Sequence, residues 1–380
     1  MFLFYCCLVT FSYSLIIPHR LPSRATFRSS PFKGFNGLRD SATSTRQHSA
    51  STKNIIDIAQ VQQDPTVWTM PGYRKPLHWV QKVSHLEDAL QFYKSNFNFE
   101  IYRHEEFASG CEATCNGPYG GAWSKTMMGP PGGEGQSFCL ELVYNYGVNR
   151  YERGNELRSI GMNIKSFVGD KSLIGVDSAG QKFLDTPDGH WLNLIDDSDD
   201  RISVLSTASN SPIQIQDEAI KFISVHVSNL TSSIAYYEDI LGANVRINTE
   251  NSPSSYAVCT WDQIALSENK NFDDIIGHVP VSPTAVILTQ LSQGAKMEFE
   301  ASQGRMAIET DDAAIEKIAH TARISEENGS GKIVHGPVCL EPHGEKVLIV
   351  RDEDGHEYCF VDARGFKTCV DVSIKQVRDN

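Results

Sequence analysis

Two stretches of the chain repeat one pattern of apolar and polar positions. Each opens with an apolar-rich run typical of a strand, at 77–83 and at 220–227. A Val-Ser-x-Leu motif follows, and apolar residues then recur at the three- and four-residue spacing of a helix before a second strand-like run. An offset of 144 residues places Ser84 on Ser228 and Tyr93 on Tyr237. The pattern therefore predicts two copies of a strand–helix–strand unit.

A second repeat marks the far end of each copy. Thr186–Asp196 and Asp352–Asp362 both contain Asp-Gly-His followed by an apolar run. Asp-Gly is typical of a tight turn and the run after it of a strand. The offset is now 166, so the second copy carries longer loops. We predict a first domain at 75–197, a polar linker at 198–215 and a second domain at 216–365.

Composition and charge agree with this organisation. The 380 residues are 40% hydrophobic and 21% charged, which is ordinary for a globular protein of about two domains. The net charge of −13 disfavours binding to nucleic acid or to an anionic membrane surface.

The first 60 residues differ from the rest and predict a targeting presequence. Met1–Ile17 is apolar and uncharged but short for a membrane span, and the Ser- and Arg-rich stretch after it has the composition of a transit peptide. This combination resembles the bipartite presequence of plastid proteins, which is removed from the mature chain. A secretory signal or a mitochondrial presequence is the alternative.

The cysteines give no sign of a zinc finger or of a CxxC redox motif. The sequence has nine, of which Cys6 and Cys7 lie in the presequence. Cys111 and Cys115 could form a redox pair, but no basic partner for either thiol is evident from the sequence. We therefore predict that both are free structural thiols.

Several motifs point to one family. LHWVQKV from Leu77, RHEEFASGCEATCNGPYGGAWSKTMMG from Arg103 and LELVYNYGVNRYERGN from Leu140 resemble the glyoxalase, or vicinal-oxygen-chelate, superfamily. The resemblance covers residues 75–365. It implies an α+β fold of tandem domains, each made of two paired βαβββ modules that form cupped mixed sheets with helices on the outer faces. It also implies an activity related to that of lactoylglutathione lyase.

The resemblance further implies a divalent metal, zinc, nickel or a similar ion, because imidazole and carboxylate ligands suit these ions. His78 takes the place of the first histidine ligand and Glu141 that of the first glutamate, which makes Glu141 the candidate catalytic carboxylate. The alternative is that the two form a hydrogen-bonded pair inside the sheet. The other positions of the two expected sites hold neither histidine nor glutamate. They are Ser159, Asn193, Phe222, Thr289, Arg305 and Cys359.

Because this set is incomplete, we do not expect ordinary glyoxalase I catalysis. Glu357 points to the same face of its strand as Cys359 and could supply a third metal ligand if the first and fourth modules face each other. The alternative is that Glu357 is a solvated residue at the end of a strand.

Two further residues are candidates for ligand binding. By resemblance, Asn145 contacts the backbone of glutathione and Lys82 contacts a carboxylate. The alternatives are a turn-forming asparagine and a surface lysine. The implied partners are a small-molecule substrate or a glutathione-type ligand, and the resemblance also allows a homodimer.

Three functions follow from these residues. The first is a metal-dependent glyoxalase-like lyase that acts on a small carbonyl compound or thiol adduct. The second is a non-catalytic protein that binds such a ligand in the same fold. The third is an interaction scaffold, since fold does not imply function.

Overall fold

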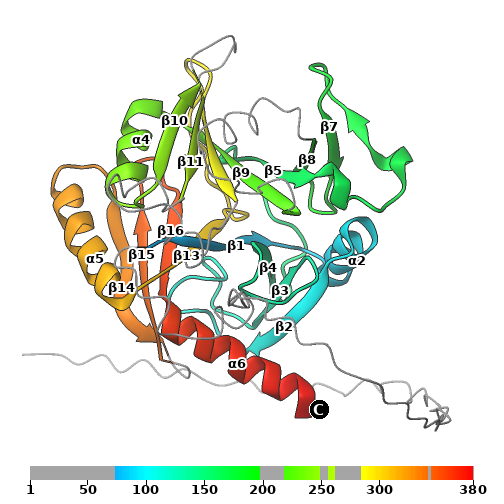
Figure 1. Ribbon diagram of the computed structural model, residues 1–380, viewed down its shortest axis with the longest axis horizontal. Helices are drawn as coiled ribbons and strands as arrows, with labels where there is room; N and C mark the ends of the chain where they lie inside the picture. Colours follow the sequence, from blue (N-terminus) through cyan, green and yellow to red (C-terminus); the bar gives the residue numbers. More distant parts are fainter. Residues whose placement is uncertain (1–72, 197–217, 249–255, 262–283, 341–343, 380) are drawn as a thin grey trace, which may run out of the picture. The chain divides into compact units, whose positions relative to one another are not determined.

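The computed structural model of the protein describes residues 73–196, 218–248, 256–261, 284–340 and 344–379 (Figure 1). The predicted presequence and linker lie outside the described residues. Two mixed β-sheets of eight strands each, accompanied by helices, confirm the α+β class. No helix in the described part is long and apolar enough to cross a membrane.

The first sheet contains both ends of the folded chain. Its strands, in the order in which they neighbour each other, are β14 (Lys332–Leu340), β15 (Glu345–Arg351), β16 (Glu357–Asp362), β13 (Arg305–Thr310), β1 (Lys75–Lys82), β4 (Cys139–Asn145), β3 (Trp123–Gly129) and β2 (Glu100–Phe107). The first and fourth modules thus form this sheet.

The second sheet contains the middle of the chain. Its strands in spatial order are β10 (Asn244–Asn248), β11 (Tyr256–Thr260), β12 (Ala285–Gln290), β9 (Ile220–Val227), β5 (Leu157–Asn163), β8 (Trp191–Ile195), β7 (Lys182–Asp185) and β6 (Gly175–Val176). The second and third modules form it.

The pairing of modules corrects one expectation. Two modules do pair to form each sheet, but the partners come from different halves of the sequence. The ranges 75–197 and 216–365 therefore do not each close a sheet of their own. The antiparallel pairs β1–β13 and β5–β9 join the modules. Strand edges pair according to where they meet in space, and the order of modules along the chain does not fix this.

Three modules carry an α-helix between their first and second strands. These helices are α2 (Leu86–Phe97), α4 (Leu230–Asp239) and α5 (Asp312–Glu327). The second module has instead two short 3₁₀ turns, η1 (Ile164–Ser166) and η2 (Lys171–Leu173), so the expected helix is absent from its described residues. Its sequence explains this, because Gly169 interrupts a stretch without helical periodicity.

The two repeated sequence motifs touch each other in the fold. Asp188 of the first Asp-Gly turn accepts hydrogen bonds from the backbone N–H of Ser84 at 2.8 Å and from its hydroxyl at 2.5 Å. Asp354 of the second turn accepts one from the N–H of Ser228 at 2.9 Å. Each contact links the start of a helix in one module to a turn in the next module. The fourfold repeat thus explains why serine and aspartate recur at these places.

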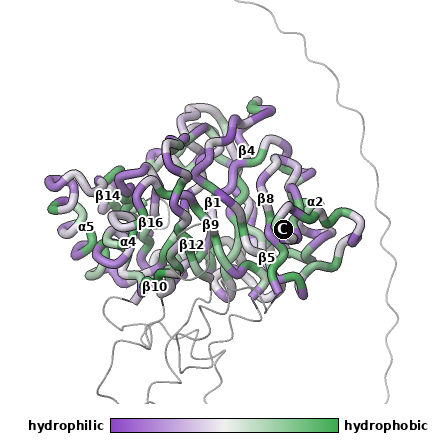
Figure 2. Tube along the Cα trace, turned by 90° about the horizontal axis from the view of Figure 1, so that it is seen from above, coloured by the Kyte–Doolittle hydropathy of each residue, from purple (hydrophilic) through white to green (hydrophobic). Residues whose placement is uncertain are grey.

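One apolar core lies between the two sheets. Alternate residues of the strands, such as Trp79 of β1, Ile223 of β9 and Tyr358 of β16, are buried there. Figure 2 shows the apolar segments, in green, gathered among the central strands. Because side chains alternate along a strand, the residues between them face away from this core. In each sheet this second face is the one that the superfamily resemblance expects to be cupped.

We predict that Gly161→Ala destabilises the fold across the β5–β9 pair. An added Cβ would lie 2.4 Å from the ring of Phe222, which is fully buried. Such overpacking costs about 1–3 kcal/mol, which a denaturant melt measures. Gly121→Ala is the matched control, because nothing lies within 4 Å of the position of its Cβ. An unchanged midpoint for Gly161→Ala would contradict the packing described.

Candidate functional site

The first sheet brings together the sequence-predicted candidates on the face turned away from the shared core. We call this face the first cup and define it by the alternating residues of its four central strands. They are His78, Val80 and Lys82 of β1, Glu141, Val143 and Asn145 of β4, Arg305, Ala307 and Glu309 of β13, and Glu357, Cys359 and Val361 of β16.

His78 and Glu141 form a close pair in this cup. The His78 Nε2 atom lies 3.2 Å from Glu141 Oε2, and both side chains are largely buried. Burial alone would raise the pKa of Glu141, but the hydrogen bond and charge of His78 outweigh burial and hold the pKa at about 2. Glu141 is therefore a carboxylate at neutral pH. His78 Nδ1 is buried and, among the described residues, has no hydrogen-bond partner.

The strand register corrects the assignment of the third ligand position. Ala307, not Arg305, lies opposite His78 and beside Cys359, whereas Arg305 lies opposite Val80. The alanine offers no donor atom to a metal. Burial raises the pKa of the Cys359 thiol to about 11, so it stays protonated at neutral pH. The sequence alone could not give this assignment, because it depends on how β13 pairs with both β1 and β16.

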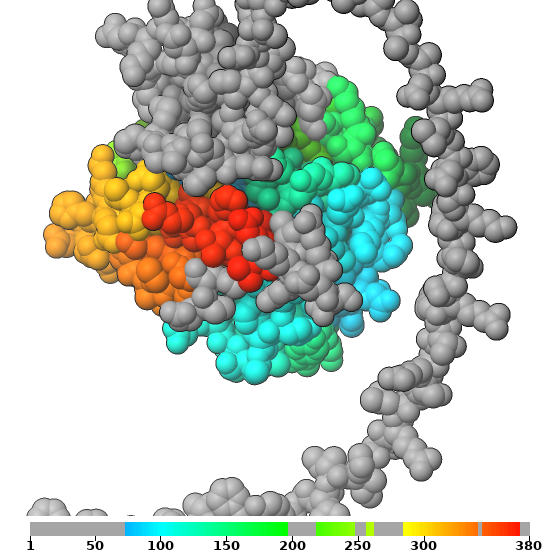
Figure 3. Space-filling view, turned by 60° about the horizontal axis from the view of Figure 1, so that its bottom comes forward, coloured from blue at the N-terminus to red at the C-terminus, as the bar shows by residue number. Residues whose placement is uncertain are grey.

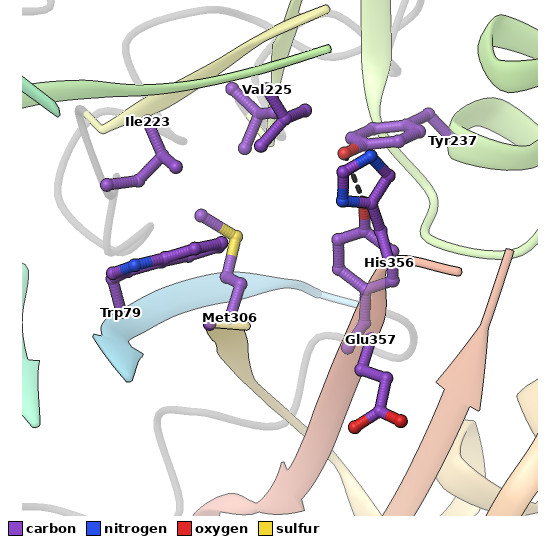
Figure 4. A pocket seen from close by; sticks show the side chains of 10 residues that line it. Trp79, Ile223, Val225, Tyr237, Met306, His356 and Glu357 are labelled. Atoms are coloured by element: carbon purple, nitrogen blue, oxygen red, sulfur yellow. Dashed lines mark hydrogen bonds between the residues drawn. The ribbon is translucent and has the colours of Figure 1, made fainter. Parts of the chain in front are cut away.

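Glu357 lies in the same cup, with its carboxylate held by two arginines. Its Oε2 accepts hydrogen bonds from Arg305 Nε at 3.0 Å and Nη2 at 2.5 Å, and its Oε1 accepts from Arg351 Nε at 3.1 Å. Burial would raise the pKa of Glu357, but the two guanidinium groups lower it. Figure 4 shows this carboxylate pointing away from the small cavity lined by Trp79, Ile223 and Met306 between the sheets. Glu357 is thus a buried residue that is paired with arginines and not a solvated one.

These residues do not fit a divalent metal of the glyoxalase I kind. His78 and Glu141 supply two donors, whereas a stable site usually takes at least three from the protein. The described residues contain no group of three or more histidine, cysteine, aspartate or glutamate side chains placed to share an ion. Lys82, Arg305 and Arg351 add positive charge to the cup.

Lys82 is a buried cation of the first cup and not a surface residue. It is 6% exposed, and its Nζ donates to the carbonyl oxygen of Gln303 at 2.5 Å. Burial, and then the charge of Arg305, lower its pKa to about 8. Gly117 passes directly over it, since a Cβ there would lie 2.9 Å from Lys82 Cε.

Asn145 is engaged within the protein. Its side-chain oxygen accepts from Asn116 Nδ2 at 2.9 Å, and its Nδ2 donates to the Asn116 carbonyl oxygen and to Tyr151 Oη, each at 3.0 Å. In this state Asn145 fastens the loop between β2 and β3 to the floor of the cup.

That loop also overturns the prediction of free thiols. Cys111 and Cys115 are joined by a disulfide, with their Cα atoms 5.5 Å apart. Arg305 lies beneath the loop and donates to the carbonyl oxygen of Ala113 at 2.8 Å. Sequence reasoning missed the contact of this arginine with the segment between the two cysteines because 190 residues separate Arg305 from Cys115. The repeat pattern offered no signal for the contact.

The C-terminal helix α6 (Ala363–Asp379) covers another part of the first cup. Phe366 and Val370 of this helix pack against Leu77 and Ala307. Figure 3 shows α6, in red, lying between strands of the fourth module, in orange, and of the first module, in cyan. Apolar side chains therefore occupy the space beside the missing ligand position.

The second sheet has no pair of an imidazole and a carboxylate like that of His78 and Glu141 among the described residues of its equivalent strands. The positions equivalent to His78 and Ala307 are Phe222 and Gly161, which lie opposite each other, and Asn193 lies beside Gly161. The ring of Phe222 packs over the glycine within a small apolar cluster. Thr289 lies opposite His226, two residues beyond the position expected for a ligand.

The known proteins that this chain is similar to agree with the fold described. No protein-family model matches the sequence. The chain is 29% identical to Glyoxalase 1 of Caenorhabditis elegans over 299 residues, which cover 77% of this chain and 90% of that protein. In structure it is similar to glyoxalase I from Zea mays, with a TM-score of 0.58, 21% identity, and coverage of 79% of this chain and 96% of that one.

Together, these likenesses support the resemblance of the chain to the glyoxalase, or vicinal-oxygen-chelate, superfamily. Within it, the chain is similar to Glyoxalase domain-containing protein 4 of Rattus norvegicus. The two are 28% identical over 301 residues, which cover 77% of this chain and 87% of that protein.

We predict that a third donor would turn the first cup into a metal site. Cys359→Glu places a carboxylate near His78 and Glu141, and we expect it to bind zinc or nickel at least about tenfold more tightly than the wild type. Cys359→Gln is the matched control, because it has the same shape without the charge. Isothermal titration calorimetry measures the affinities. Equal affinity of the wild type and the two variants for the metal would contradict the idea that the first cup lacks only a third metal ligand.

We also predict that the stability of the fold depends on pH through the ionisation of Glu141. Its pKa is lowered in the folded state, so the stability that it contributes is present above its ordinary pKa of 4.5 and is lost as the pH falls toward 2. The difference in unfolding free energy between the wild type and Glu141→Gln should shrink over this interval, by about 1–3 kcal/mol. Denaturant melts at several pH values measure it, and a constant difference would argue against an ionised, paired Glu141.

Proposed function

We propose that the protein is a glyoxalase-like binding protein that holds a small anionic carbonyl or thiol-adduct metabolite in the first cup. The observation that carries this proposal is the contrast between the two sheets. The first cup retains His78 and Glu141 and adds buried cations, whereas Phe222 fills the equivalent place in the second sheet.

The charge of the first cup favours an anionic ligand. Glu357 neutralises part of the charge of Arg305 and Arg351, but within the described residues Lys82 Nζ has a single hydrogen-bond acceptor, the Gln303 carbonyl. The ammonium group keeps donors for another partner. A carboxylate or an enolate oxygen would give charge-assisted hydrogen bonds there, which are about twice as strong as neutral ones.

The pair of His78 and Glu141 supplies polarity without metal chemistry. An imidazole and an ionised carboxylate side by side can orient a hydroxyl or carbonyl group of the ligand by hydrogen bonding. The isomerisation of a hemithioacetal needs in addition a base to move the proton. No second carboxylate of the first cup is free for this, because Glu357 is paired and Glu309 accepts a hydrogen bond from Tyr73.

The second candidate is a metal-dependent lyase, and a specific observation favours it. The relative from Caenorhabditis elegans is named Glyoxalase 1 and matches over 77% of this chain. In that case the first cup would have to gain its remaining ligands on binding metal and substrate. Zinc, nickel or a similar ion would be the cofactor.

We expect that Lys82→Met weakens binding of S-lactoylglutathione about tenfold or more, because it removes a charge-assisted hydrogen bond. Lys94→Met on α2 is the matched control, since Lys94 is exposed on the far side of the sheet. Isothermal titration calorimetry with and without EDTA measures both. Unchanged affinity in Lys82→Met would exclude the first cup as the binding site.

Metal analysis and an activity assay of the purified wild-type protein decide between the binding protein and the metal-dependent lyase. We expect little metal by elemental analysis and no more than slow lactoylglutathione formation from methylglyoxal and glutathione. About one tightly held divalent ion per chain together with rapid turnover would establish the lyase.

Two features remain proposals that rest on the sequence alone. Residues 1–60 are proposed to direct the protein to a plastid, with a mitochondrial or secretory destination as the alternative. N-terminal sequencing of the mature protein, expected to begin near Ala50, tests this. A homodimer is likewise a proposal that light scattering tests.

A further inference from the structure

The loop at 108–122, between β2 and β3, lies over the first cup and is held in place by hydrogen bonds. Trp123 Nε1 donates to the carbonyl oxygen of Ser109 at 2.9 Å, and Gly110 N donates to that of Gly120 at 3.2 Å, so the base of the loop is closed. Asn116 and Asn145 tie its middle to β4. We call this segment the cup loop.

The disulfide lies inside the cup loop and reaches both the floor of the cup and the solvent. Cys111 and Cys115 pack against the buried cluster of Val80, Trp123 and Val143. Both cysteines are also partly exposed. A bond in this position can hold the loop down and still be reached by a small molecule.

Arg305 contacts the residues between the two cysteines. Its guanidinium donates to the Ala113 carbonyl at 2.8 Å and to Thr114 Oγ1 at 3.0 Å. Thr114 has φ 54°, a left-handed conformation that a residue with a branched side chain rarely adopts. The disulfide and the arginine together hold the loop in this conformation.

We propose that Cys111 and Cys115 form a thiol-exchange site for low-molecular-weight thiols, and that the disulfide form clamps the cup loop over the first cup. A thiolate attacks one of the two sulfurs, the S–S bond breaks, and the other cysteine leaves as a thiolate. A second thiol attacks the mixed disulfide and releases the small disulfide. The protein gains two electrons and two protons, and the two thiols lose them.

The other described cysteines differ from this pair. Cys139 and Cys259 are fully buried, and burial raises the pKa of both thiols. Cys339 is exposed on β14 and is free. Cys339 is therefore an internal control, because it is accessible to solvent but forms no disulfide. The proposal does not depend on which metabolite the first cup binds.

The test uses the full chain in buffers of different ratios of reduced to oxidised glutathione. Samples are alkylated and mapped by mass spectrometry, and hydrogen exchange of the peptide that spans the cup loop is measured in parallel. We expect Cys111 and Cys115 to change state together as one two-electron couple, with a trapped mixed disulfide with glutathione at intermediate ratios. We expect amide exchange in the cup loop to rise about tenfold on reduction.

Two variants complete the test. Cys111→Ser with Cys115→Ser should show the fast exchange in every buffer, and Cys339→Ser should respond as the wild type does. The comparison of the oxidised with the reduced wild-type protein needs no variant. The test therefore still holds if the double variant fails to fold. Independent alkylation of the two cysteines at all ratios, or equal loop exchange in both states, would overturn the proposal.

Discussion

The antiparallel pairing of β1 with β13 is the interaction on which the rest of the structure depends. It joins the first module to the fourth across more than two hundred residues of chain and sets His78 opposite Ala307. Because β13 pairs in turn with β16, the same register brings Cys359 and Glu357 to the floor of the first cup. A shift of one residue in either pair would turn these side chains into the apolar core. The chemistry of the cup is thus a consequence of strand register.

Arg305 organises the polar part of the cup that this register creates. It neutralises Glu357, contacts the residues between Cys111 and Cys115, and adds to the effect of burial in lowering the pKa of Lys82. A buried guanidinium needs several acceptors, and here a carboxylate, a carbonyl and a hydroxyl provide them. The arginine therefore links the floor of the cup to the loop above it. A divalent ion would have to compete with this arrangement of positive charge.

The two sheets show how one fold can hold a polar site or a packed core at equivalent positions. Where the first sheet has the small Ala307 beside His78, the second has Gly161 beneath the ring of Phe222. An aromatic ring fills the volume that polar side chains take in the first cup. Within the part of the chain that the structure describes, the fourfold repeat of modules therefore yields one candidate site of this kind.

The sequence by itself determined the modules and their resemblance to one superfamily. The Val-Ser-x-Leu and Asp-Gly-His repeats specify local turns and helix starts, and local hydrogen bonds such as that from His356 N to Asp352 Oδ1 fit them. His78 and Glu141 could also be found, because each lies within a distinctive motif of its own strand. Which modules pair, which residue lies beside Cys359 and what holds Glu357 were decided only by the tertiary structure. These features arise from hydrogen bonds and charges between strands distant along the chain, and the periodicity of a single strand contains no information about its neighbours.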